Sequence, residues 1–123
     1  EDGTVIDFER AAFAHPALDL AALLEDPRMD GSDREAAKQR YREVFGSCSS
    51  QRMSDAEFDR WYAFYRVHHA VCQVGSQVRF GRRELARAYL PKAYEATRDL
   101  DGKLYELFRG FVGKTPVLSS LEG

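Results

Sequence analysis

The chain has 123 residues, of which 44% are hydrophobic, 12% aromatic and 31% charged, and this composition fits one globular domain rather than a disordered or fibrous protein. Its 18 Lys and Arg residues against 20 Asp and Glu residues leave a net charge of -2, so no overall field attracts nucleic acid or an anionic membrane, and neither partner is expected. No apolar run reaches the ~20 residues of a membrane span, and two cysteines are too few for a disulfide scaffold, which favours a cytoplasmic location.

The chain opens on a short β-type segment. An Asp2-Gly3 pair suits a tight hairpin turn because Gly accepts positive φ, and the run Val5-Ile6-Asp7-Phe8 follows it. Residues 1–9 are therefore interpreted as the end of a β-hairpin whose first strand lies upstream. A strand without its partner exposes unpaired backbone groups, so we expect it to pair with another chain and to permit a homo-oligomer.

Residues 10–112 are predicted to form about five helices, which makes the chain mainly α. The first helix enters at His15-Pro16, because Pro is tolerated in a first helical turn, and ends near Asp26-Pro27. Ser32 and Glu35 form a capping-box pattern for a second helix that runs to Phe45. A linker of helix breakers follows over residues 46–50.

A long third helix is predicted over residues 55–80, with Ser54 as its N-cap and Gly81 as its end. Apolar side chains on several of its sides predict a central position in the fold. Gly75 within this helix predicts close packing of another helix, or a kink.

The fourth predicted helix, over residues 84–99, contains a proline. Pro91 cannot donate a backbone hydrogen bond, so it predicts a break or kink at Leu90. A short fifth helix over residues 103–112 and a flexible tail over residues 113–123 complete the chain.

Asp7 is the residue that most directly suggests chemistry. A carboxylate at the end of a buried strand is held rigidly, and it can bind Mg²⁺ while its apolar neighbours anchor the strand. The spacing alone favours a plainer role, in which Asp7 is a strand-end or turn-initiating carboxylate.

Two longer stretches carry a resemblance to a known family. They are Gly3-Thr4-Val5-Ile6-Asp7-Phe8-Glu9-Arg10-Ala11 and His15-Pro16-Ala17-Leu18-Asp19-Leu20-Ala21-Ala22-Leu23-Leu24. Together they resemble the aminoglycoside phosphotransferase and choline kinase superfamily of small-molecule kinases, in which an Ile-Asp strand is followed by a Gly-Asp-Pro helix entry. Ala14-His15-Pro16 stands where that family usually has Gly-Asp-Pro. A looser similarity continues to the neighbourhood of Leu100.

The resemblance implies that Asp7 binds the Mg²⁺ that bridges the nucleotide phosphates, and that Asp19 braces the catalytic loop. It also implies an ATP-dependent phosphotransferase acting on a hydroxyl of a small molecule such as an aminoglycoside, a sugar or choline. The chain would be the helical C-terminal subdomain of that protein-kinase-like fold, because the family's His-x-Asp-x-x-x-x-Asn base loop and phosphate-binding lysine are not in it. The isolated chain is therefore expected to be inactive and to need an N-terminal lobe or a complementary chain.

A second hypothesis is a non-catalytic module. In this interpretation the helices serve interaction or dimerisation, or are the remnant of a pseudokinase, and Asp7 only caps backbone groups.

Three further groups of side chains have chemistry to consider. His68 or His69 with Cys72 has a spacing suited to one metal ion, but two ligands do not make a site. A basic cluster near the end of the long helix favours a solvated face over a phosphate site: Arg79, Arg82, Arg83 and Arg87. Three acids after the first helix could face a cationic or hydroxyl-rich acceptor: Glu25, Asp26 and Asp30.

Overall fold

The computed structural model describes residues 17–48 and 54–123. These residues form six α-helices and no strand, so the prediction of a mainly α chain is confirmed for this part. The predicted strand and Asp7 lie outside the described residues. The helices are α1 (Ala17–Leu24), α2 (Gly31–Cys48), α3 (Asp55–Arg79), α4 (Arg83–Leu100), α5 (Gly102–Lys114) and α6 (Pro116–Ser119).

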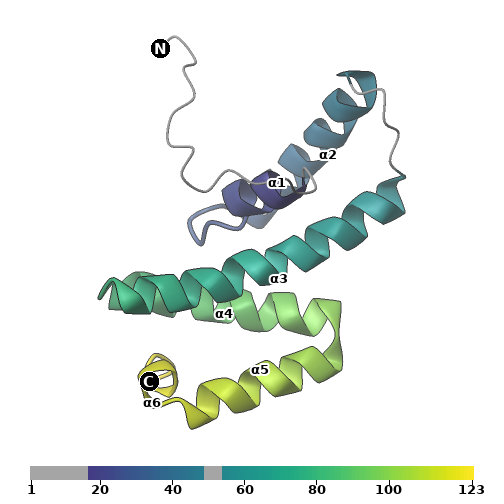
Figure 1. The fold of residues 1–123 in the computed structure, drawn as a ribbon. Helices are drawn as coiled ribbons and strands as arrows, with labels where there is room; N and C mark the ends of the chain where they lie inside the picture. Colours follow the sequence, from purple (N-terminus) through teal and green to yellow (C-terminus); the bar gives the residue numbers. More distant parts are fainter. Residues whose placement is uncertain (1–16, 49–53) are drawn as a thin grey trace, which may run out of the picture.

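The long helix α3 is the centre of the arrangement (Figure 1). It packs along α4 on one side and against α1 on another, while α5 packs on α4 and α6 on α5. Short connections make α3, α4 and α5 successively antiparallel, so α3 and α5 run in the same direction. Among the described residues no helix is long and apolar enough to cross a membrane.

Two apolar clusters hold the helices together. The cluster between α1 and α3 uses α1 positions at spacings of three and four; it contains Ala17, Leu20, Ala21, Leu24, Phe58 and Tyr62. The cluster between α3, α4 and the C-terminal helices contains Ala70, Val74, Ala86, Tyr89, Leu90, Ala93, Val112, Leu118 and Leu121. Alanines on α4 keep side-chain bulk low where α3 crosses, which lets the two helix axes approach closely.

The ends of the predicted helices are partly corrected by the structure. Ser54 caps α3 as predicted, since its hydroxyl accepts a hydrogen bond from the Glu57 amide at 3.1 Å, and Gly81 follows α3 with φ of 70°. The predicted capping by Ser32 is wrong. Asp30 caps α2 instead: its carbonyl accepts from the Arg34 amide at 3.0 Å and its carboxylate accepts from the Ser32 amide at 2.8 Å. The helix also runs on to Cys48, past the predicted end.

Each of two predictions about helix interiors offered two alternatives, and the structure excludes one of each: a break at Leu90 and close packing within the described chain at Gly75. α4 continues through Pro91 without the predicted break, because Pro91 removes one backbone bond while Leu90 and Ala93 on either side remain anchored in the core. Gly75 is exposed, and a Cβ added there would meet nothing within 4 Å. Close packing within this chain is therefore not the reason for Gly75.

The last residues differ from the flexible tail that the sequence predicts. Residues 116–119 form α6, and Leu118 and Leu121 are buried in the core. Arg83 fixes this segment by donating to the Ser120 carbonyl at 2.8 Å. Leu118 and Leu121 form an apolar pattern of only two residues, which is too short to predict a helix from the sequence.

Adjacent leucines at the end of α1 provide a test of this packing. Leu24 is 2% exposed and Leu23 is 65% exposed. We expect Leu24→Ala to lower the free energy of unfolding by about 2–4 kcal/mol, because it leaves a cavity between α1 and α3. Leu23→Ala should change it by less than about 0.5 kcal/mol. Urea unfolding followed by circular dichroism measures both, and equal losses would contradict this placement of α1.

Candidate functional site

Of the two acids singled out by the sequence, the structure describes only Asp19. Asp7 lies outside the described residues. Asp19 is in the first turn of α1, where its side chain is exposed while the next residue, Leu20, is buried against α3. The helix thus turns its apolar face inward and leaves the Asp19 carboxylate on the outer face.

A different acid, Glu25, is the most buried charged group of the described chain. It follows the last residue of α1, and only 1% of it is exposed. The Tyr62 hydroxyl donates to its carboxylate at 2.8 Å, and Arg66 Nε donates at 2.6 Å. Arg34 Nη1 reaches both carboxylate oxygens, at 3.2 and 3.3 Å. Helices α1, α2 and α3 therefore meet at one carboxylate.

Burial and charge act in opposite directions on this cluster. Burial by itself would raise the pKa of Glu25, but hydrogen bonds from Tyr62 and Arg66 and the charges of Arg66 and Arg34 outweigh it, so the pKa is lowered. A carboxylate at a helix C-terminus is also opposed by the helix dipole. The arginines are thus required to keep Glu25 ionised, and the buried carboxylate in turn raises the pKa of the Tyr62 hydroxyl, together with burial.

Arg66 extends the network to α4. Its Nη1 donates to Asp99 at 2.8 Å, and its Nη2 lies 2.9 Å from Glu95. Burial alone would lower the pKa of Arg66, yet its hydrogen bonds to Asp99 and Glu25 raise it. The Arg66 guanidinium on α3 therefore uses all three nitrogens to link the Glu25 carboxylate, after α1, with two carboxylates on α4.

A polar cavity of about 360 Å³ lies beside this network. Its α2 wall carries three basic side chains spaced four residues apart, and these face carboxylates from α3 and α4. Lys38 Nζ lies 4.4 Å from the centre of the Tyr62 ring, and Arg42 Nη1 donates to Asp59 at 2.8 Å. The lining residues are Glu25, Arg34, Glu35, Lys38, Arg42, Asp59, Tyr62, Ala63, Arg66, Glu95 and Asp99.

The chain matches no family model, no curated protein and no solved structure.

What the polar cavity can do follows from its own side chains. The Glu25 carboxylate accepts hydrogen bonds from two arginines and a tyrosine, and it also lines the cavity. The hypothesis that Glu25 faces an acceptor stays a prediction. Within residues 17–48 and 54–123 no group of three or more His, Cys, Asp or Glu side chains could hold a metal ion. The network is built to fix helices relative to one another.

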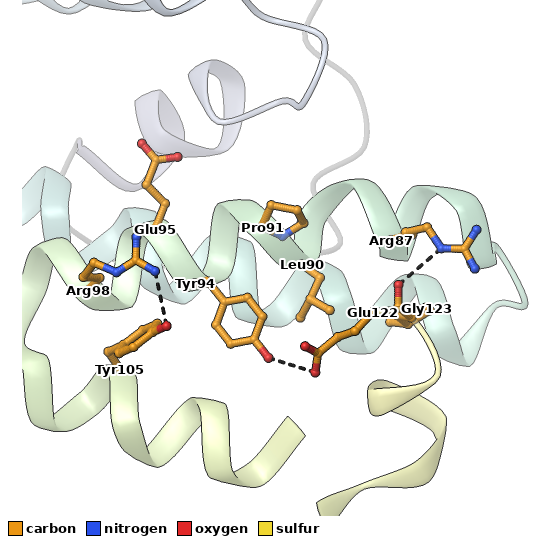
Figure 2. Close-up of a pocket in the computed structure, with 10 residues that line it drawn as sticks. Arg87, Leu90, Pro91, Tyr94, Glu95, Arg98, Tyr105, Glu122 and Gly123 are labelled. Atoms are coloured by element: carbon orange, nitrogen blue, oxygen red, sulfur yellow. Dashed lines mark hydrogen bonds between the residues drawn. The ribbon is translucent and has the colours of Figure 1, made fainter. Parts of the chain in front are cut away.

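A second cavity, of about 520 Å³, lies between α4, α5 and the last residues of the chain (Figure 2). Leu90 and Tyr94 point from α4 toward the C-terminal segment. The Tyr94 hydroxyl donates to Glu122 at 3.2 Å, and burial together with that carboxylate raises the pKa of Tyr94 to about 12. Arg87 Nε donates to the Leu121 carbonyl at 3.3 Å. These bonds close the C-terminal segment onto α4.

The histidines and Cys72 of α3 do not form a metal site. Cys72 Sγ lies 3.9 Å from His68 Nε2, and both residues are exposed. His69 instead turns toward α4, where its ring lies 5.9 Å from that of Tyr89. Its Nε2 atom is buried without a hydrogen-bond partner, and burial lowers its pKa.

The sequence does not reveal the Glu25 network. Tyr62 and Arg66 are one helical turn apart, as are Arg34 and Lys38, and such spacings predict shared helix faces. Nothing in them indicates that a carboxylate 37 residues before Tyr62 is their partner. The one available signal is a Glu directly after an apolar helix, where a carboxylate is unfavourable unless cations surround it.

Removing the Glu25 charge should be costly. We expect Glu25→Gln to lower the free energy of unfolding by about 2–4 kcal/mol at neutral pH, because the partly buried Arg34 and Arg66 lose the counter-charge that lies between them. Glu35→Gln is a matched control, since Glu35 borders the same cavity but its side chain is 68% exposed, and it should cost less than about 1 kcal/mol.

The Glu25→Gln variant should also differ from the wild type in how its stability depends on pH below neutrality. Because the folded-state pKa of Glu25 is below its ordinary 4.5, its contribution is complete above that pH and is lost as the pH falls through the folded-state value. Glu25→Gln should flatten this loss in urea unfolding measured below pH 4.5. A wild-type acid profile in the variant would contradict the role given to Glu25.

Protonation of His69 should cause a second, smaller loss of stability at mildly acidic pH. Its folded-state pKa is below the ordinary 6.5, so protonation favours the unfolded chain, and stability present above pH 6.5 declines as the pH falls below it. We expect His69→Leu to reduce the stability difference between pH 7 and pH 5. A wild-type difference in His69→Leu, in the same unfolding measurements, would contradict the role given to this imidazole.

Proposed function

We propose that the chain is the C-terminal helical part of an ATP-dependent phosphotransferase that acts on a hydroxyl of a small molecule. The observation that carries the proposal is the pair of sequence stretches in which Asp7 is followed by the helix entry containing Asp19. Phosphoryl transfer needs a rigidly placed carboxylate for Mg²⁺ and a second acid to support the loop that holds the nucleophile.

The placement of Asp19 supports the second of these roles. An acid that braces a loop must be fixed at its backbone and open at its carboxylate. Asp19 fits this requirement, because Leu20 and Leu24 anchor α1 in the core while the Asp19 side chain is exposed.

The Glu25 network supports the proposal in another way. The proposed metal ligand Asp7 belongs to the segment that leads into α1, so a firmly held α1 would help to position it. Arg66 and Tyr62 hold the end of α1 to the middle of α3, with donor distances of 2.6 and 2.8 Å. In the proposed kinase this network is a positioning device for the segment before α1, and it does not touch the substrate.

The proposed cofactors are Mg²⁺ and ATP. Mg²⁺ keeps several waters and is usually held by one or two carboxylates together with substrate phosphates, so Asp7 would supply one protein ligand beside the nucleotide phosphates and water. When bound, the ion would neutralise charge on the phosphates. The base and the phosphate-binding lysine would come from an N-terminal lobe or a complementary chain, and the acceptor class spans aminoglycosides, sugars and choline.

The test uses the complete polypeptide. A His-x-Asp-x-x-x-x-Asn segment upstream of Glu1 is expected, and Asp7→Asn should lower Mg²⁺-dependent ATP turnover by at least about 100-fold. Asp19→Asn should give a smaller loss, because it acts through the loop. Asp33→Asn, at an exposed position in the first turn of α2, is the control and should keep full activity. Undiminished turnover in Asp7→Asn would overturn the metal-ligand role.

A non-catalytic interaction module is the second candidate. Large apolar side chains exposed on α3 and α5, among them Phe64, Leu107 and Phe111, favour it. The two candidates separate in one measurement, because a module without catalytic parts would show no ATP turnover in the complete polypeptide.

A further inference from the structure

An apolar groove runs between α3 and α5. One wall is a stripe of α3 side chains at spacings of three and four, the other is a similar stripe on α5, and the end of α4 forms the floor. The groove has a volume of about 510 Å³ and is lined by Phe64, Val67, His68, Val71, Cys72, Thr97, Leu100, Leu104, Leu107, Phe108 and Phe111. No Lys, Arg, Asp or Glu is among these residues.

The groove exists because α4 packs on both neighbours while α3 and α5 hardly touch each other. In Figure 1 the three helices form a layer with α4 between α3 and α5. In a four-helix bundle the apolar faces of four neighbouring helices enclose one shared core. The described chain supplies three of these four positions.

Three apolar side chains at the rim of the groove are largely exposed to solvent. Leu107 is 72% exposed, Phe111 is 59% exposed and Phe64 is 50% exposed. Scattered exposed apolar residues need no explanation, but a contiguous set around a groove marks an interaction surface. Leu107 and Phe111 are one helical turn apart on α5, so they form a ridge beside the groove.

We propose that a second copy of this chain covers the groove, with α5 of each copy lying against α3 and α5 of the other. A two-fold dimer requires one self-complementary patch. The α5 ridge and the groove satisfy that requirement, because both belong to the same face and both are apolar. The two α5 helices would cross near Leu107 and Phe111, and each would complete the partner's helical layer.

The area is sufficient for such a dimer. With ~200 Å² for a large side chain, exposed fractions of 72%, 59% and 50% leave roughly 350 Å² of these three side chains open in each copy. Burying them with the half-exposed lining residues in both copies removes roughly 1,000 Å² from water, which is the size of a weak, concentration-dependent interface.

Two glycines support a close approach on this face. Gly75 follows Phe64 by about three helical turns on the same side of α3, and Gly110 lies next to the ridge on α5. A Cβ at either position would meet nothing within 4 Å in the single chain, although a helix-interior Gly costs about 1 kcal/mol relative to Ala. Glycine at these positions would allow the backbone of another copy to approach closely, whereas no contact within the single chain requires it.

This dimer is independent of the proposed kinase activity. It uses neither Asp7 nor Asp19, and it differs from the strand pairing predicted from residues 1–9. A chain with no phosphotransferase activity would form it equally well.

Sedimentation equilibrium on the chain tests the proposal. We expect a concentration-dependent dimer, and Leu107→Glu or Phe111→Glu should raise its Kd more than about tenfold, because a charge would be placed in an apolar contact. Leu23→Glu is the matched control: Leu23 is 65% exposed on α1, away from the groove, and the variant should keep the wild-type Kd. Circular dichroism checks that each variant is folded.

A second readout uses the thiol in the groove. In a Cys48→Ser background, alkylation of Cys72 by a maleimide should be slower in concentrated than in dilute samples, and Leu107→Glu should remove this dependence. A monomer at all concentrations would overturn the proposal. So would a dimer that survives both α5 substitutions, since another surface, such as the N-terminal strand, would then hold it.

Discussion

The Glu25 carboxylate is the constraint on which the arrangement of the N-terminal helices depends. It is buried at the C-terminal end of α1, where the helix dipole opposes a negative charge, and it stays ionised because Arg66, Tyr62 and Arg34 donate to it. Those donors come from α3 and α2, and Arg66 continues to Asp99 on α4. A single buried carboxylate therefore links the end of α1 to α2 and α3, and Arg66 continues the network to α4, in addition to the apolar packing.

The two apolar clusters follow from the length of α3. α3 is long enough to take part in both clusters, so α1 packs near its beginning and α4 near its end. α2 packs on the first cluster through the partly buried Ala37 and Tyr41. It is further attached through the long side chains of Arg34, Lys38 and Arg42. Because charged side chains bridge a gap that apolar ones would close, a polar cavity remains between α2 and the rest.

The two proposals use different surfaces of the same scaffold. The kinase proposal concerns the segment before α1 and treats the Glu25 network as its support. The dimer proposal concerns the groove between α3 and α5, and the described chain offers no charged lining residue to keep that groove in water. Helix α4 connects the two regions, since Asp99 meets Arg66 while Thr97 and Leu100 lie at the groove floor. Loss of either surface would leave the other in place.

The sequence by itself determined the mainly α character, the long central helix, its Ser54 cap and its end at Gly81, because periodicity, caps and positive φ are local properties. It did not determine that α4 passes through Pro91 or that residues 116–121 pack into the core, because contacts with distant residues override local preference there. Only the tertiary structure decided that Glu25 is a buried carboxylate held by Tyr62 and Arg66, since folding brings these partners to it. The same holds for the groove: the stripes on α3 and α5 are readable in the sequence, but their lack of a covering helix is a property of the packed chain.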